Sequence, residues 1–168
     1  MLKLQVTKSG KIGIIGTEGT ISSGAYEKAI NEINKNIKMT LRACPLFVPI
    51  AEEGWQDTEI AFLTAQNYLW DFKKSDIDAL IMACTHYPLL EKTIGKVLGE
   101  GIKLVNPAYE TAKVLEYMIN SNGLKNDRPH KGDYKYYVSD NPVKFKKTGE
   151  NFLEKPVGWV EKIDIEKY

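Results

Sequence analysis

The chain has 168 residues, of which 43% are hydrophobic, and this length and composition suit one domain with a substantial core. Its 23 basic and 22 acidic residues nearly cancel, so the charge does not favour nucleic acid or an anionic membrane as a partner. No apolar run approaches the roughly 20 residues of a membrane span, and residues 1–8 lack a secretory apolar core, so we expect a cytoplasmic protein with reduced cysteines.

Short strands and helices alternate from the start of the chain. An apolar run at residues 11–16 predicts a buried strand, and a turn rich in glycine and threonine at 16–20 leads to a helix that Ser22 or Ser23 could cap. Backbone N–H groups of this turn could receive an anion, although a plain connection without a ligand is the simpler interpretation. The turn matches neither the dinucleotide fingerprint nor the phosphate loop.

A second strand at residues 37–41 runs into residues 43–50, an apolar stretch with two prolines. Because proline does not fit a helix interior or a central strand, we expect a packed loop there. Within this stretch, Cys44 is expected to be a small buried hydrophobic residue and not a nucleophile. Glu52 and Glu53 follow, and their spacing alone fits two surface carboxylates.

The most informative stretch is residues 79–90, where an apolar run ends on Cys84 and is followed by Thr85 and His86. We interpret it as a buried strand, a tight turn and a helix with Pro88 in its first position. Open α/β sheets bind ligands at the carboxyl ends of their strands, and the positive end of a following helix favours the reactive thiolate. Taken alone, these residues leave open a structural thiol and a structural histidine.

A helix capped by Asp57 or Thr58 precedes this stretch, and a short strand at 102–105 and a helix from 106–107 follow it. Strands and helices that alternate with short connections predict an α/β fold, with a parallel sheet flanked by helices.

The composition changes after residue 120. Residues 121–131 are polar and predict an exposed loop. A strand at 134–138, a helix from 141 to 153 and a half-exposed terminal strand at 157–165 are expected to follow.

Three segments point together to one family. They are residues 14–21 with 23–26, residues 43–49 with 52–54, and the Cys-Thr-His-Tyr-Pro motif at 84–88. In this order and at these separations they resemble the second half of the glutamate racemases, in the aspartate/glutamate racemase family. The likeness covers most of the chain and continues more weakly through residues 138–140 to the end.

The resemblance implies an isomerase without cofactor or metal that interconverts L- and D-glutamate and supplies D-glutamate for peptidoglycan. Two cysteines of this family face opposite sides of the α-carbon: one thiolate removes the α-proton, and the other thiol returns a proton from the far side. By motif match, Cys84 is the second of these cysteines, and His86 assists it. Glu52 matches a nearby carboxylate, with Glu53 as the alternative. The implied substrate-binding residues are Thr85, His86, Thr17 and Thr20.

The family's first half, which bears the other catalytic cysteine, has no counterpart in this sequence. Cys44 does not replace that cysteine, because its segment matches a structural stretch of the second half. The resemblance implies two parts: residues 1–113, an α/β racemase domain carrying Cys84, and residues 114–168, a return segment that completes the other domain. We therefore expect a truncated racemase with little activity alone, whose return segment dimerises or is poorly ordered.

Two other functions stay open. The chain could be a non-catalytic module that binds a carboxylate or acts through an interface, or a related racemase acting on aspartate or hydantoins. The leading hypothesis has glutamate as its small-molecule partner. The sequence has only two histidines and no Cys-x-x-Cys pair, so a structural zinc site is not expected.

Overall fold

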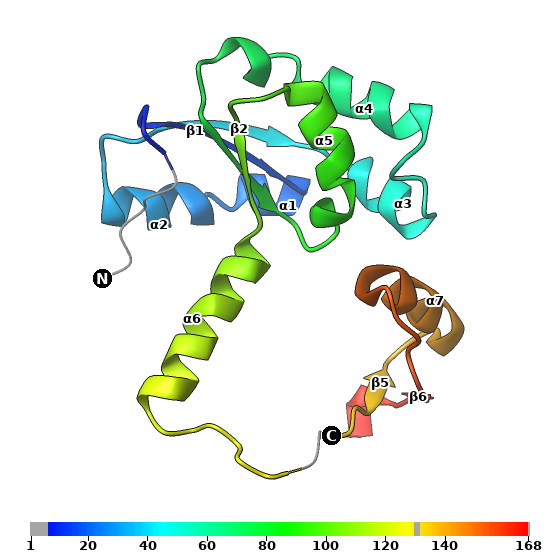
Figure 1. The fold of residues 1–168 in the computed structure, drawn as a ribbon. Helices are drawn as coiled ribbons and strands as arrows, with labels where there is room; N and C mark the ends of the chain where they lie inside the picture. The colour runs from blue at the N-terminus through cyan, green and yellow to red at the C-terminus, as the bar shows by residue number, and fades with distance from the viewer. Residues whose placement is uncertain (1–6, 130–131, 168) are drawn as a thin grey trace. The chain divides into compact units, whose positions relative to one another are not determined.

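The structure is a computed structural model in which residues 7–129 and 132–167 are described. The chain divides into two units, the first ending at Met118 and the second beginning at Ile119 (Figure 1). The first unit contains a four-stranded parallel sheet flanked by helices, and the second contains a pair of parallel strands and a helix. The α/β fold expected from the alternation of strands and helices is confirmed.

The sheet of the first unit has the strand order β2-β1-β3-β4, and all its strands are parallel. Its strands are β1 (Lys11–Gly16), β2 (Lys38–Ala43), β3 (Ala79–Ala83) and β4 (Lys103–Val105). All five residues of β3 are buried, as its continuous apolar run predicts for a strand covered on both faces. Gly16 pairs with Ala83, so β1 and β3 end level at one edge of the sheet.

Helices cover both faces of this sheet (Figure 1). They are α1 (Glu18–Ser22), α2 (Ala25–Ile33), α3 (Phe47–Glu52), α4 (Glu59–Leu69) and α5 (Glu91–Leu98), with 3₁₀ helices η1 (Phe72–Lys74) and η2 (Tyr87–Leu90). After β4, α6 (Pro107–Ser121) extends away from the sheet and buries none of its residues (Figure 1). Alternate residues of β3 face opposite ways: Leu80 and Met82 pack in the core formed with α3, α4 and α5, and Ile81 packs in the core formed with α2. None of the helices formed by the described residues is long and apolar enough to cross a bilayer.

The prediction of a loop over residues 43–50 was wrong in part, because Phe47–Glu52 forms α3. Pro49 is the third residue of this helix, where a backbone N–H would have no partner within the helix, so proline loses no hydrogen bond there. Cys44 is fully buried, as expected.

The cap predicted for the first long helix was also wrong. The expected turn at 16–20 already contains the start of α1, whose N-cap is Thr17: its hydroxyl accepts a hydrogen bond from the Thr20 N–H at 3.2 Å. Gly24, rather than Ser22 or Ser23, is the N-cap of α2, and its φ of 64° lies in the left-handed region that favours glycine.

The helix expected to open at Pro88 starts differently. Tyr87–Leu90 forms the 3₁₀ helix η2, and α5 begins only at Glu91. Cys84 does lie in a turn after the strand, but the expected helix with Pro88 in its first position was wrong, because η2, with His86 as its N-cap, lies between this turn and α5.

The second unit contains β5 (Tyr136–Val138), α7 (Pro142–Leu153), β6 (Val160–Lys162) and the 3₁₀ helix η3 (Ile165–Lys167). β5 and β6 pair in parallel, and both are shorter than the predicted strands. Asn141 caps α7, because its side-chain oxygen accepts hydrogen bonds from the Val143 and Lys144 N–H groups, both at 3.0 Å. Val157 is the one buried hydrophobic residue among those described in this unit, and Trp159 is 67% exposed.

Candidate functional site

Cys84 lies directly after β3, in a turn that aromatic side chains fix to the core. The Tyr87 N–H donates a hydrogen bond to the Cys84 carbonyl oxygen at 3.2 Å, and the Tyr87 hydroxyl donates one to the Cys44 carbonyl oxygen at 2.8 Å. The ring of Phe47 packs edge-on against that of Tyr87, with centroids 5.3 Å apart. Burial, followed by the charges of Cys44 and Cys84, raises the pKa of Tyr87, so this phenol remains a donor. Cys84 itself is only half-buried.

A chain of polar contacts runs from the thiol to a carboxylate. The Sγ atom of Cys84 lies 3.9 Å from Nδ1 of His86, and Nε2 of His86 lies 3.5 Å from Oε1 of Glu52. The carboxylate favours the imidazole tautomer that carries its proton on Nε2, which leaves Nδ1 as an acceptor for the thiol. The hydroxyl of Thr85 also lies within reach of Nδ1, at 3.4 Å. This arrangement can accept a proton from Cys84 and return it.

The two candidate carboxylates are placed differently by the structure. Glu52 is the last residue of α3, and it reaches His86. Glu53 follows as the C-cap of the helix, and its side chain is exposed. The structure therefore brings Glu52, and not Glu53, to the imidazole.

The two candidate threonines lie together where β1 ends. Their hydroxyl oxygens are 2.9 Å apart, and Thr17 also caps α1. A Cβ atom on Gly16 would lie 3.1 Å from Cγ2 of Thr20, so glycine allows the start of α1 to approach the strand closely. Because β1 and β3 end level, these hydroxyls and Cys84 share one edge of the sheet.

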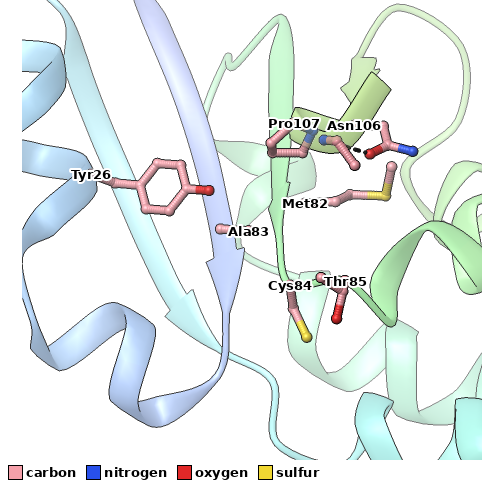
Figure 2. Close-up of a pocket in the computed structure, with 8 residues that line it drawn as sticks. Tyr26, Met82, Ala83, Cys84, Thr85, Asn106 and Pro107 are labelled. Atoms are coloured by element: carbon pink, nitrogen blue, oxygen red, sulfur yellow. Dashed lines mark hydrogen bonds between the residues drawn. The ribbon is translucent and has the colours of Figure 1, made fainter. Parts of the chain in front are cut away.

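A cavity of about 170 Å³ opens beside the thiol (Figure 2). It is lined by Tyr26, Met82, Ala83, Cys84, Thr85, Asn106, Pro107 and Ala108. The sequence predicted two of these as site residues, Cys84 and Thr85, and missed Tyr26 and Asn106. A signal for Asn106 existed, because it directly follows β4, the parallel neighbour of β3. Nothing in the sequence predicted that Tyr26 would line this cavity.

The second cysteine has no such surroundings. Cys44 is fully buried, and its Sγ lies 3.8 Å from the Arg42 carbonyl oxygen. Burial raises the pKa of the Cys44 thiol to about 12, although the charge of Arg42 acts in the opposite direction. This thiol is therefore unsuited to proton transfer near neutral pH. No group of three or more potential metal ligands is found within residues 7–129 and 132–167.

Comparison with known proteins gives a consistent result. The family model of the Asp/Glu/Hydantoin racemases matches residues 1–115. Glutamate racemase of Geobacter metallireducens is 47% identical over 161 residues, which make up 96% of this chain and 60% of the relative. Glutamate racemase of Neisseria meningitidis serogroup A is 39% identical over 162 residues, again 96% of this chain and 60% of the relative. The chain thus spans about 60% of the length of these curated relatives.

Solved structures agree with the sequence relatives. Glutamate racemase of Francisella tularensis, in complex with D-glutamate, superposes with a TM-score of 0.86 at 36% identity, over 95% of this chain and 59% of that one. The glutamate racemase isoform RacE1 of Bacillus anthracis gives a TM-score of 0.88 at 36% identity, over 96% of this chain and 60% of that one. The chain therefore belongs to the Asp/Glu/Hydantoin racemase family.

Proposed function

We propose that this chain supplies one side of the active site of a glutamate racemase, with Cys84 as one of the two thiols. The observation that carries the proposal is the contact chain from Glu52 through His86 to Cys84, at the carboxyl edge of a parallel sheet. Relatives up to 47% identical are named glutamate racemases, and one similar structure holds D-glutamate.

The reaction is a proton transfer at the α-carbon of glutamate. Nδ1 of His86 takes the proton of the Cys84 thiol, and the resulting thiolate removes the α-proton from one face of the substrate. Glu52 stabilises the imidazolium that forms, because its carboxylate faces Nε2. A second thiol on the opposite face returns a proton to the carbanion, which inverts the configuration. In the other direction Cys84 donates the proton.

The hydroxyls of Thr17, Thr20 and Thr85 bind the substrate in this proposal. These hydroxyls lie at the same sheet edge as the thiol, and they can donate hydrogen bonds to the carboxylates of the substrate. Two thiols suffice for the proton transfers, so the reaction needs no cofactor. Both thiols must stay reduced, which we take to place the enzyme in the cytoplasm.

The sequence offers no second thiol for the far face of the substrate. It contains Cys44 and Cys84 alone, and Cys44 is buried. We therefore expect the isolated chain to convert L-glutamate to D-glutamate at a negligible rate.

A chimera tests the proposed function directly. The part of the Geobacter metallireducens glutamate racemase that this chain does not match would be fused to the chain, and conversion of L-glutamate to D-glutamate would be followed by chiral chromatography. We expect racemisation by the chimera and none by the chain alone. A folded chimera that racemises aspartate but not glutamate would overturn the choice of substrate, and efficient racemisation by the chain alone would overturn the proposal that the chain holds only one side of the active site.

Residues 114–168 form, in this proposal, a return segment that packs with the part of a racemase that the chain does not match, and residues 1–113 form the domain of Cys84. The exposed apolar side chains of residues 114–168 support this assignment, since Leu115, Phe145 and Trp159 are 55%, 41% and 67% exposed. Exposed apolar patches favour association. Light scattering on the pure chain should therefore detect dimers, and a monodisperse monomer would count against the assignment.

A further inference from the structure

We infer that Tyr26 is a further substrate-binding residue, whose hydroxyl donates a hydrogen bond to a carboxylate of the glutamate held at Cys84. The inference rests on the proposed function, because it takes glutamate as the ligand. Nothing in the motifs that resemble racemases assigns this tyrosine a role.

Tyr26 reaches the cavity from a different element of the fold. It is the second residue of α2, and it lines the same cavity as Cys84 and Thr85. Figure 2 shows its ring extending from the helix toward the end of β3, with the hydroxyl foremost. The ring packs against the core that includes Ile14 and Ile30, which holds it in place while its polar end faces the cavity.

The hydroxyl of Tyr26 differs from those of the other tyrosines packed in the first unit. The Tyr87 hydroxyl donates to the Cys44 carbonyl oxygen at 2.8 Å, and the Tyr68 hydroxyl accepts from the Leu46 N–H at 3.3 Å. Over residues 7–129 and 132–167, no hydrogen bond to the Tyr26 hydroxyl is found. Tyr26 is half-buried as a residue, and its hydroxyl is free to donate a hydrogen bond to a ligand in the cavity.

Another polar atom of the cavity is already engaged within the protein. The side-chain oxygen of Asn106 accepts hydrogen bonds from the Ala108 and Tyr109 N–H groups at 3.0 and 3.4 Å. None of the lining residues is acidic, so the lining places no carboxylate beside a bound anion.

The phenol also keeps its proton beside the thiol. Burial, followed by the charge of Cys84, raises the pKa of Tyr26, so the hydroxyl remains a donor when Cys84 is a thiolate. A neutral donor next to a thiolate suits a carboxylate, because charge-assisted hydrogen bonds are the stronger kind.

Protection of Cys84 from alkylation tests the inference on the whole chain. Iodoacetamide would be added with increasing D-glutamate, and labelling of the Cys84 peptide would be followed by mass spectrometry. Tyr26→Phe removes the hydroxyl and keeps the ring. The matched control is Tyr117→Phe, at a side chain that is 72% exposed on α6. Buried Cys44 reports on folding, because its labelling should stay negligible in every variant.

We expect D-glutamate to slow labelling of the unmodified chain. Tyr26→Phe should raise the half-protecting concentration about tenfold, the size expected for a hydrogen bond to a charged group, and Tyr117→Phe should leave it unchanged. Equal protection of the unmodified chain and Tyr26→Phe would overturn the role of Tyr26 alone. An absence of protection in the unmodified chain would overturn the proposed function, and the role of Tyr26 with it.

Discussion

The unit that ends at Met118 and the unit that begins at Ile119 use their apolar residues differently. The first encloses a four-stranded sheet between two cores. The second has one pair of strands, and Val157 is the one buried hydrophobic residue among those described there. Two-stranded sheets are marginal without a surface to pack on. The first unit can therefore hold the turn of Cys84 in place, whereas the described residues of the second unit enclose no comparable core.

The largest expected effect sharpens this comparison with a matched pair of substitutions. Phe47→Ala removes a fully buried ring that packs on Tyr68 and Tyr87, and it should lower the free energy of unfolding by about 3–5 kcal/mol. Phe145→Ala removes a ring that is 41% exposed, and it should cost less than about 1 kcal/mol. Urea unfolding followed by circular dichroism measures both. If both variants lost the same free energy of unfolding, the contrast between the two units would be contradicted.

A smaller effect is expected where the core meets the turn of Cys84. Tyr87→Phe removes one of two hydrogen bonds to the Cys44 carbonyl oxygen, which keeps the bond from the Phe47 N–H at 3.1 Å, and should cost about 0.5–1.5 kcal/mol. Because the Tyr87 hydroxyl ties the turn of Cys84 to the segment of Cys44, we expect the labelling rate of Cys84 to change as well. A variant with unchanged stability and an unchanged rate would show that the hydroxyl does not fix this turn. Tyr117→Phe, on the exposed surface of α6, is the matched control.

The smallest predicted effect concerns the opposite edge of the sheet. Burial alone would raise the pKa of the Asp78 carboxyl, but hydrogen bonds from Thr7, Ser9 and Lys8 lower it to about 2. Because the folded-state pKa lies below the unfolded value of about 3.9, this carboxylate stabilises the fold above pH 4, and the contribution is lost as the pH falls toward 2. The midpoint of urea unfolding should therefore fall between pH 7 and pH 2.5 in the unmodified chain, and it should fall by less in Asp78→Asn. An identical difference would contradict this role.

The sequence predicted the centre of the sheet well because β3 is a continuous apolar run and β1 is apolar apart from its glycines and first lysine. It failed where a local rule had an exception: Pro49 lies in the first turn of a helix, which proline tolerates, and Gly24 caps α2 without a side chain. The turn of Cys84 was recognisable because Cys84, Thr85 and His86 are consecutive in the chain.

Other parts of the site depend on contacts between distant segments. Tyr26 and Asn106 reach the cavity of Cys84 from two other elements, and only the packing of α2 and the pairing of β4 with β3 brings them there. The contact between Glu52 and His86 likewise joins the end of α3 to the turn after β3, and spacing alone could not choose Glu52 over Glu53.

The contrast between the two cysteines gives the most direct test of the central claim, that Cys84 is the thiol this chain contributes to the racemase site. Conversion of L-glutamate to D-glutamate would be compared in the chimera carrying Cys84→Ala and in the chimera carrying Cys44→Ala. Loss of racemisation in the first and its retention in the second is the predicted result. Racemisation that survives Cys84→Ala would contradict the claim.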